Sequence, residues 1–497
     1  MSLINIRRKY KHFFHIEAVF AVVVITILSA CTSNRAQLEG NEANVIFTID
    51  TNIKYQYVRG FGGMDVGWEN FPQTSARDAE LMFNPDTGLG LNILRIMIMP
   101  WNTDISETMN TLITGARPDY YENVKIVNRH GGYVLASPWT PPAVWKSNNS
   151  NTTQGNGRLL RAHYQDYANY LRAFAMNMYE NGAPIYAVSI QNEPNYEVDY
   201  DGCLWSPQEM RDFFLQVGRF TEGVRGFGGG RQIPSVLTMN GESANHPNIN
   251  DAALDNPQSR AVIDLIGRHT YGNRLNRYVK AIEHPTAPRE VWMTENNMNS
   301  GNANGYPSDS TWDYVWKILN DIDLSIRLND ESAYIWWAAK RFYSFIGDGQ
   351  WGTIEGEILP RGYAISHYAK FAKETYRVAV FADGETSDGS YVTSRNFNTM
   401  SDNVDGTAAR ATAFVSPNGR TITVVMFTPT TTDGTGGVDM GNVRIQLPAN
   451  FRIREATAMR TSEGSFAQME TVQIAPNRNS AVVSLPRGNI LSVRFKR

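Results

Sequence analysis

The stretch AHYQDYANYLRAFAMNMYENGAPIYAVSIQNEP, from Ala162 to Pro194, contains the pattern that decides the fold. Its first part places apolar residues three and four positions apart and ends in glycine, which predicts an amphipathic helix over 162–182. Its second part is a short apolar run, as expected for a strand buried on both faces. The run ends in Asn192 and Glu193, so a carboxylate follows directly where the strand stops. A helix followed by such a strand is one repeat of a parallel α/β fold.

Similar apolar runs recur through the middle of the chain, and most are followed by a helical pattern. Eight are found, at 56–65, 91–101, 132–142, 185–194, 235–243, 264–272, 290–297 and 333–341. Eight buried strands alternating with helices predict a (β/α)8 TIM barrel. One of the helices is expected after Ser206, in SPQEMRDFFLQVGRFTEG, where Glu209 completes a capping box. Functional residues of such barrels lie at the C-terminal ends of the strands, which is where the polar residues of these runs are found.

The sequence changes in character after about residue 376. Helical patterns stop, and short β-type runs separated by turn residues predict an antiparallel β-sandwich side domain over 376–497. The run ANVIFTID, ahead of the barrel, predicts that residues 43–57 contribute one more strand to this domain. The catalytic barrel is then expected over 58–375.

The N-terminal segment has the pattern of an export signal. A basic stretch over 7–15 precedes an apolar stretch over 18–30, which is shorter than the roughly 20 residues that span a bilayer. The following Leu-Ser-Ala-Cys resembles a bacterial lipobox, so 1–31 is expected to be a lipoprotein-type signal peptide with Cys31 lipidated, and 32–42 a polar tether. An ordinary secretory signal is the alternative. The protein is therefore expected to be exported, either anchored to a bacterial membrane at the cell surface or in the periplasm, or secreted.

The composition excludes several classes of function. Hydrophobic residues make up 42% of the 497 and charged residues 19%, which is typical of a globular protein, and the net charge of −3 offers no basic surface for nucleic acid. The eight histidines show no metal-ligand spacing, and no glycine-rich phosphate loop follows a strand. We expect no metal, no cofactor and a monomer. With Cys31 lipidated, Cys203 has no partner for a disulfide.

Two glutamates occupy the ends of predicted strands. Glu193 ends the fourth strand and Glu295, in WMTENN, ends the seventh, so both should lie at the mouth of the barrel. Glycoside hydrolysis needs such a pair, one to protonate the leaving oxygen and one to attack the anomeric carbon or activate water. Asn192 beside Glu193 could hold a sugar 2-hydroxyl, which favours Glu193 as acid/base and Glu295 as nucleophile. Arg95, near the end of the second strand, is a plausible charge partner that keeps Glu295 ionised.

Several long motifs resemble those of glycoside hydrolase family 30, and most closely those of its glucuronoxylan endo-xylanases. The resemblance covers about 58–377 and implies a retaining mechanism with Glu193 as acid/base and Glu295 as nucleophile, on a barrel joined to a β-sandwich. The motifs are GFGGM (60–64), SPWTPPAVWKSNNS (137–150), NGAPIYAVSIQNEPNYEVDYDGCLWS (181–206), IGRHTYG (266–272), VWMTE (291–295), AYIWW (333–337) and RGYAISHYAKF (361–371).

The resemblance also implies substrate-binding residues. Trp139 offers a flat face for a pyranose ring, and Arg341 matches the arginine that binds a methylglucuronate side group of xylan. The full set of expected substrate-binding residues is Trp68, Trp139, Asn192, His269, Tyr271, Trp337, Arg341 and Tyr343.

The sequence departs from the family beyond the eighth strand. Ala338 stands where the family usually has tyrosine, and the following loop brings Asp348, Glu355 and Glu357, whose charges would oppose glucuronate binding. The expected function is an endo-β-1,4-xylanase, with or without glucuronate recognition. The alternatives are another family 30 β-glycosidase, such as a β-1,6-glucanase or a glucosylceramidase-like enzyme, and a non-catalytic carbohydrate-binding lipoprotein.

Overall fold

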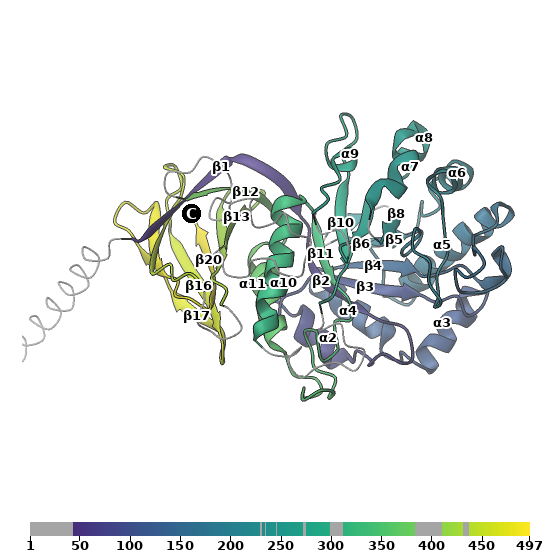
Figure 1. Ribbon diagram of the computed structural model, residues 1–497, viewed down its shortest axis with the longest axis horizontal. Helices are drawn as coiled ribbons and strands as arrows, with labels where there is room; N and C mark the ends of the chain where they lie inside the picture. The colour runs from purple at the N-terminus through teal and green to yellow at the C-terminus, as the bar shows by residue number, and fades with distance from the viewer. Residues whose placement is uncertain are drawn as a thin grey trace, which may run out of the picture.

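The computed structural model describes residues 43–228, 231–233, 235–244, 246–271, 275–298, 312–382, 410–430 and 437–497. These ranges form a closed eight-stranded barrel and a separate sheet at one end of the molecule (Figure 1). The predicted TIM barrel with a β-type side domain is therefore confirmed. The expected signal peptide, Cys31 and the tether 32–42 lie outside the described residues and stay predictions.

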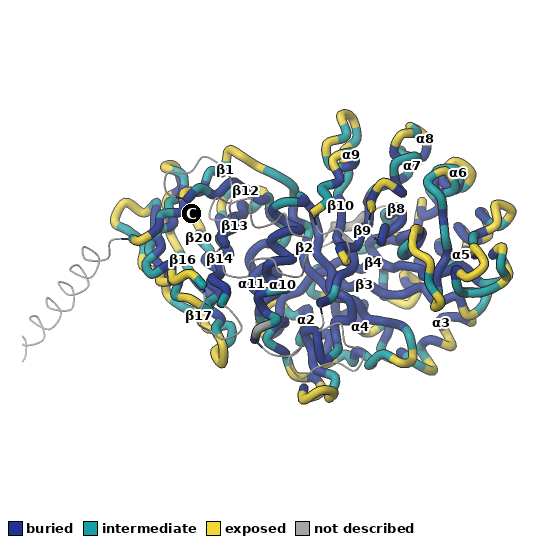
Figure 2. The backbone as a smooth tube through the Cα atoms, in the orientation of Figure 1, coloured by how far each residue is buried: buried dark blue, intermediate teal, exposed yellow. Residues whose placement is uncertain are grey.

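The barrel consists of eight parallel strands that pair in the order β10-β11-β2-β3-β4-β5-β8-β9. Each of them falls within one of the eight apolar runs of the sequence. Nearly all their residues are buried, because the barrel interior covers one face and the helices cover the other (Figure 2). The strands are β2 (Gly60–Asp65), β3 (Ile93–Ile98), β4 (Tyr133–Pro138), β5 (Ala187–Ser189), β8 (Leu237–Ser243), β9 (Leu265–His269), β10 (Glu290–Glu295) and β11 (Ala333–Trp336).

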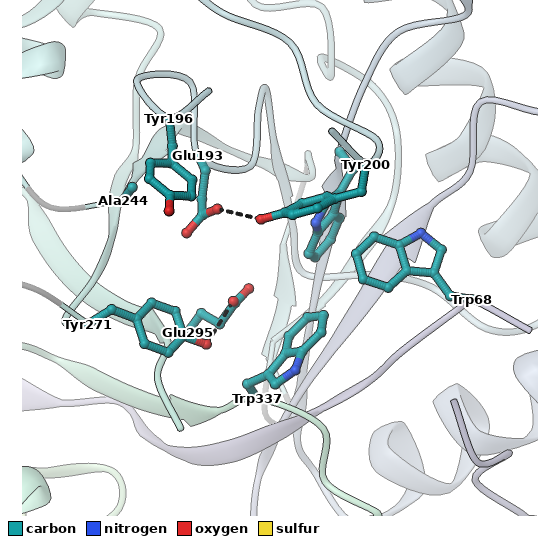
Figure 3. Close-up of a pocket in the computed structure, with 9 residues that line it drawn as sticks. Trp68, Glu193, Tyr196, Tyr200, Ala244, Tyr271, Glu295 and Trp337 are labelled. Atoms are coloured by element: carbon teal, nitrogen blue, oxygen red, sulfur yellow. Dashed lines mark hydrogen bonds between the residues drawn. The ribbon is translucent and has the colours of Figure 1, made fainter. Parts of the chain in front are cut away.

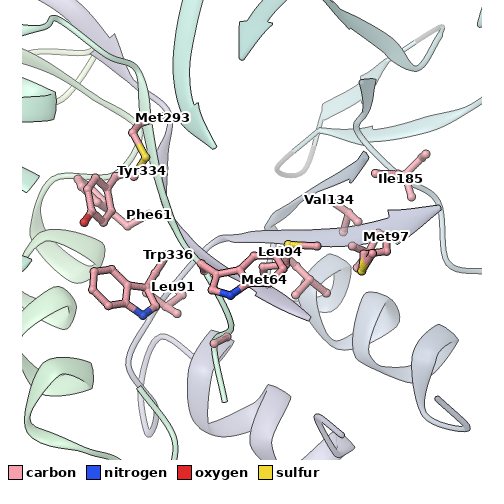
Figure 4. Packing of buried hydrophobic residues seen from close by; sticks show 14 of the residues in the cluster. Phe61, Met64, Leu91, Leu94, Met97, Val134, Ile185, Met293, Tyr334 and Trp336 are labelled. Atoms are coloured by element: carbon pink, nitrogen blue, oxygen red, sulfur yellow. The ribbon is translucent and has the colours of Figure 1, made fainter. Parts of the chain in front are cut away.

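Close packing explains the glycines of the GFGGM motif on β2. A Cβ at Gly62 would lie 2.0 Å from the carbonyl oxygen of Ile93 on the neighbouring strand, so a larger side chain has no room there. Outside the barrel, Phe61, Leu94 and Val134 belong to the apolar layer between strands and helices (Figure 4). The interior is filled by a separate cluster that includes Ile93, Tyr133, Leu135, Tyr186, Trp292 and Ile335.

The helices that cover the barrel begin and end at recognisable signals. α5 (Tyr164–Glu180) is the helix predicted over 162–182, and it stops before Gly182, whose φ of +70° suits glycine. α6 (Pro207–Val217) has the predicted capping box of Ser206 and Glu209, although it ends at Gly218, before the predicted run is complete. The other helices are α2 (Ala76–Phe83), α3 (Ile105–Thr114), α4 (Tyr120–Arg129), α7 (Asp251–Asp255), α8 (Pro257–Arg260), α9 (Val279–Ile282), α10 (Asp313–Asp323) and α11 (Pro360–Phe371).

Shorter elements complete the barrel domain. They are single turns of 3-10 helix at Ala143–Trp145, Arg161–His163 and Pro247–Asn250, a π-helical turn at Leu324–Leu328, and a hairpin of β6 (Gly226–Gly228) and β7 (Arg231–Ile233).

The side domain is one ten-stranded sheet with the order β17-β16-β20-β14-β13-β12-β1-β15-β19-β18. Only β1 and β15 pair in parallel among its described strands. Phe47 of β1, Val443 of β15 and Phe495 of β20 share one apolar cluster, so the strands of this continuous sheet enclose a common core, as the predicted β-sandwich side domain requires. Its strands are β1 (Val45–Val58), β12 (Thr375–Ala382), β13 (Arg410–Val415), β14 (Thr421–Phe427), β15 (Asn442–Gln446), β16 (Glu455–Ser462), β17 (Ser465–Thr471), β18 (Gln473–Ile474), β19 (Ser480–Ser484) and β20 (Asn489–Lys496).

Helix α11 joins the barrel to the side domain through a buried histidine. His367 Nδ1 lies 2.8 Å from the hydroxyl of Ser492 on β20, and its Nε2 lies 2.9 Å from the hydroxyl of Thr461 on β16. A neutral imidazole has one donor and one acceptor, and each hydroxyl can complement either. Burial lowers the pKa of His367 to about 3, so the folded protein holds this side chain neutral.

This histidine should make the domain contact sensitive to acid. In the unfolded chain the imidazole of His367 has a pKa near 6.5. As the pH falls below that value, the unfolded state binds a proton that the folded state does not bind. We expect the contribution of His367 to the free energy of unfolding to fall by about 1.4 kcal/mol per pH unit as the pH is lowered from about 6 to about 4. Thermal unfolding of wild type and His367→Gln over this range measures the effect, with His163→Gln, which lies at the surface, as the matched control. An identical pH slope in wild type and His367→Gln would contradict it.

Within the described residues, no helix combines the length and apolar character needed to cross a membrane. Cys203 is buried and free, and burial raises the pKa of its thiol to about 12. A thiol in this state is inert, so it serves as a small packing residue.

Candidate active site

A cavity of ≈ 460 Å³ lies at the C-terminal ends of the barrel strands. Glu193 and Glu295 face each other across it (Figure 3). One carboxylate oxygen of each lies within 4.8 Å of the other, although the two residues are far apart in the sequence. The rest of the wall comes from the loops after the barrel strands, including the loop that carries Glu193, and consists of Trp68, Trp139, Tyr196, Tyr200, Ala244, Tyr271 and Trp337.

Glu193 is held in a backbone conformation that side chains other than glycine rarely adopt. Its φ is +44°, and its N–H donates to the carbonyl oxygen of Glu242 at 2.9 Å, which fixes the turn beyond β5. The carboxylate Oε1 lies 2.9 Å from His269 Nδ1, and the hydroxyl of Tyr200 lies 3.5 Å from Oε2. Strained backbone of this kind collects at functional sites, where the surrounding structure stabilises it.

Glu295 is bound by a cation and a phenol. Arg95 Nη1 donates to its Oε2 at 2.6 Å, and the Tyr271 hydroxyl donates to its Oε1 at 2.9 Å. Arg95 comes from β3, is completely buried and lies with its guanidinium carbon 4.7 Å from the Trp139 ring. The pairing between Met293 and Glu295 on β10 and the neighbouring β9 shifts register, so Glu295 projects from an irregular strand end.

Arg95 does not keep the pKa of Glu295 low, contrary to the expectation from sequence. Burial raises the pKa of Glu295 and outweighs the attraction of His269 and Arg95, while the nearby Glu193 raises it further. Arg95 also forms an ion pair with Glu242, at 2.9 Å. Burial would raise the pKa of Glu242 too, yet Arg95 and His269 lower it. One guanidinium therefore forms ion pairs with two buried carboxylates, Glu242 and Glu295.

Aromatic rings form one side of the cavity. Trp68 lies 5.9 Å from both Trp139 and Trp337, centroid to centroid, and Trp139 lies 6.0 Å from Trp337. Tyr200 adds a further ring at 5.8 Å from Trp68. Flat apolar faces beside paired carboxylates suit the C–H face of a sugar ring, because such a ring has one apolar face and an edge of hydroxyls.

Two expected substrate-binding residues are occupied by protein contacts. His269 is 0% exposed and holds Glu193. The side-chain oxygen of Asn192 accepts from Arg95 Nη2 at 2.6 Å, although no hydrogen bond of its amide nitrogen is found within the described part of the chain. His269 thus positions the carboxylate and does not line the cavity, and Asn192 keeps one donor free beside Glu193.

Arg341 and Tyr343, expected as glucuronate contacts, do not line the cavity that holds the two glutamates. The guanidinium carbon of Arg341 lies 4.8 Å from the ring of Phe71, and its Nε lies 3.9 Å from Asp348 Oδ2. The side chain of Arg341 is 21% exposed, whereas that of Asp348 is completely buried. The acidic loop identified in the sequence therefore places one carboxylate against the arginine itself.

Four residues of the site were missed by sequence reasoning. Tyr196 and Tyr200 follow Glu193 on the same loop, and Ala244 follows β8. Glu242 ends the fifth apolar run in the same way that Glu193 ends the fourth, and this position was the available signal. Only the three-dimensional arrangement shows that Glu242 faces Arg95 and not the cavity.

Glu193, His269 and Glu295 place ligand-type atoms within 4.8 Å of one another, which is close enough to hold a metal ion. Arg95 already places a positive charge 2.6 Å from a Glu295 oxygen, and it would repel a second cation on that carboxylate. The arrangement therefore suits proton transfer and covalent chemistry better than metal binding.

A TIM barrel with two carboxylates facing each other across an aromatic-walled cavity at its C-terminal face defines a glycoside hydrolase. The comparisons agree: the model of the glycosyl hydrolase family 30 TIM-barrel domain matches residues 116–327. Glucuronoxylanase XynC of Bacillus subtilis (strain 168) is 28% identical over 361 residues, which cover 71% of this chain and 77% of the relative. Residues 116–327 therefore carry a TIM-barrel domain of the glycosyl hydrolase family 30 type.

Solved structures show the same fold. The subfamily 8 xylanase Xyn30A of this family, from Clostridium acetobutylicum, has a TM-score of 0.70 at 24% identity and covers 92% of this chain and 100% of its own. An endo-β-1,6-glucanase has a TM-score of 0.59 at 17% identity and covers 92% of this chain and 96% of its own. The fold is thus shared by enzymes with different substrates.

Proposed function

We propose that this protein is a retaining endo-β-1,4-xylanase that cleaves xylan both with and without methylglucuronate side groups. The observation that carries the proposal is the pair of facing carboxylates, whose oxygens lie within 4.8 Å. Retaining glycosidases place their two carboxyl groups about 5–5.5 Å apart, whereas inverting enzymes need about 6.5–9.5 Å to admit a water molecule. The similarity to a glucuronoxylanase supports xylan as the polymer.

The different partners of the two glutamates support distinct roles. Glu295 accepts hydrogen bonds from Arg95 on one carboxylate oxygen and from Tyr271 on the other, and both contacts favour its ionised form against the effect of burial. Glu193 has no arginine or lysine among its described partners; its carboxylate contacts His269 and the Tyr200 hydroxyl and lines the cavity, where a group that protonates the leaving oxygen has to lie. We therefore assign Glu295 as nucleophile and Glu193 as acid/base.

The reaction then follows two steps. Glu295 attacks the anomeric carbon while Glu193 gives its proton to the leaving oxygen, so the glycosidic bond breaks and a glycosyl ester of Glu295 forms. Glu193, now a carboxylate, takes a proton from water as that water attacks the same carbon. The ester bond breaks, Glu295 is released as a carboxylate, and the product has the configuration of the substrate.

The surroundings of Arg341 support activity that does not require the side group. Asp348 lies 3.9 Å from the guanidinium and reduces the charge that a sugar carboxylate would meet. The Arg341 side chain is nevertheless 21% exposed, so it can still contribute a hydrogen bond to a glucuronate.

Removing this arginine should distinguish the substrates. Arg341→Ala is expected to lower kcat/KM on glucuronoxylan by about fivefold, because one charge-assisted hydrogen bond is lost, and to change kcat/KM on unsubstituted xylan little. Initial rates and product sizes on both polymers, with a β-1,6-glucan as third substrate, provide the measurement. Asp348→Asn serves as the counterpart, with an expected gain on glucuronoxylan.

Equal losses of Arg341→Ala on both xylans would remove the side-group role. Hydrolysis of β-1,6-glucan in place of xylan by the wild type would replace the proposed substrate with that of the structurally similar glucanase.

A further inference from the structure

A second cavity of ≈ 690 Å³ adjoins the catalytic one. The two share Trp68 and Tyr200, so the groove continues past these rings away from the glutamates. Its other lining residues come from the loops after β2, β3, β4 and β5 and are Glu69, Asn70, Phe71, Met99, Trp101, Asn151, Thr152, Asp199 and Asp201.

Trp101 is the exposed aromatic residue of this groove. It follows β3 by three positions, is 36% exposed and lines the cavity, although no role in the chemistry was assigned to it. The Asn70, Asn151 and Thr152 residues that line the same groove supply groups that can form hydrogen bonds with sugar hydroxyls. An indole face with hydrogen-bonding groups around it is the arrangement that binds a pyranose ring.

A buried lysine holds the part of the groove wall that Asn151 and Thr152 form. Lys146 is 3% exposed, and its Nζ donates to the carbonyl oxygens of Asn151, Thr152 and Gly202 at 3.1, 2.8 and 2.5 Å. These bonds tie the loop after β4 to the loop after β5, because one ammonium group bridges both. The wall is therefore held in place in the absence of ligand, which lowers the entropy cost of binding.

The charge of the groove selects against acidic sugars. Glu69, Asp199 and Asp201 are carboxylates, and none of the described lining residues is lysine or arginine. Asp201 also lies with Oδ2 3.4 Å from the indole nitrogen of Trp68, so it links the two cavities. Carboxylates accept hydrogen bonds from sugar hydroxyls and repel a uronate.

We propose that this groove is a distal subsite for an uncharged pyranose ring of the same glycan that occupies the catalytic cavity, with Trp101 as its stacking platform. The inference rests on the proposed endo-glycosidase function and adds to it. Such a subsite makes the enzyme prefer long chains, and it requires that the sugar bound there, at this distance from the cleaved bond, is unsubstituted.

The test measures how activity depends on chain length. Trp101→Ala should lower kcat/KM for xylohexaose and for polymer about tenfold, because the stacking contact is lost, and for the shortest cleaved oligosaccharide less than about twofold. Trp101→Tyr should recover most of the loss. Tyr179 is another exposed aromatic residue, on α5, and Tyr179→Ala is the control that should leave every value unchanged.

A binding measurement on an inactive variant tests the subsite independently of catalysis. In a Glu295→Gln background, calorimetry should show xylohexaose binding that weakens about tenfold on adding Trp101→Ala, and no binding of an oligogalacturonate of equal length. Equal losses on short and long substrates, or no loss on either, would overturn the proposal, and Trp101-dependent binding of the acidic oligomer would overturn the charge assignment. If the wild type cleaves a β-glucan and not xylan, the proposed substrate is wrong. The kcat/KM ratios of wild type to Trp101→Ala on long and short oligosaccharides of that glucan then test the subsite in the same way.

Discussion

Glu295→Ala is expected to lower kcat on xylan by more than about 10⁴-fold while the protein still folds, because no other group can form the glycosyl ester. Small anions can enter the space that the side chain leaves. Azide should therefore restore part of the turnover on a substrate with a good leaving group and give a glycosyl azide of inverted configuration. The product's anomeric configuration is measured by NMR, and the unfolding temperature verifies the fold.

A carboxylate at the other end of the same strand provides the control. Glu290 begins β10 and pairs with Arg59 at 2.5 Å, away from the cavity. Glu290→Ala should cost some stability and leave kcat nearly unchanged, because the N-terminal face of a barrel serves the fold. Wild-type turnover in Glu295→Ala, or azide that fails to react, would remove Glu295 from the nucleophile role.

Glu193→Ala should have an effect that depends on the leaving group. On xylan we expect a loss of about 10³-fold or more, because the leaving sugar oxygen needs a proton. On an aryl xyloside whose phenol leaves without protonation, the first step should stay fast and the second, which needs a base, should become limiting. Azide should then accelerate turnover and yield a glycosyl azide of retained configuration.

The exposed Glu197, on the same loop, is the matched control for this variant. Glu197→Ala should behave as wild type on both substrates. An equal loss of Glu193→Ala on xylan and on the activated aryl xyloside would show that Glu193 is not the proton donor.

The barrel could be predicted because its strands form distinct apolar runs in the sequence. Runs such as 91–101 and 290–297 are apolar on both faces, and this happens only where a sheet is covered on both sides. The position of Glu193 and Glu295 at strand ends then follows from the topology, since all parallel strands of a barrel end at the same face. The resemblance to family 30 then predicted which glutamate is the acid/base and which the nucleophile, because the position at a strand end does not distinguish these roles.

The remaining features depend on distances between side chains that the sequence does not contain. Glu242 and Glu295 both end strands, yet one is neutralised by Arg95 inside the barrel and the other reaches the cavity. His269 reads as a sugar contact and is a buried support for Glu193. The side domain was predicted as a β-sandwich, but its hydrophobic alternation shows only which face of each strand is buried, so the order of the ten strands in one continuous sheet could not be predicted.

The most direct test of the proposed mechanism traps its covalent intermediate. A 2-deoxy-2-fluoro xylobioside with an activated leaving group slows the second step, so the glycosyl ester accumulates. We predict that the enzyme loses activity with one sugar bound per chain and that peptide mass spectrometry finds this sugar on the Glu295 carboxylate. A label on another residue, or an enzyme that stays fully active and releases product of inverted configuration, would contradict the retaining mechanism proposed here.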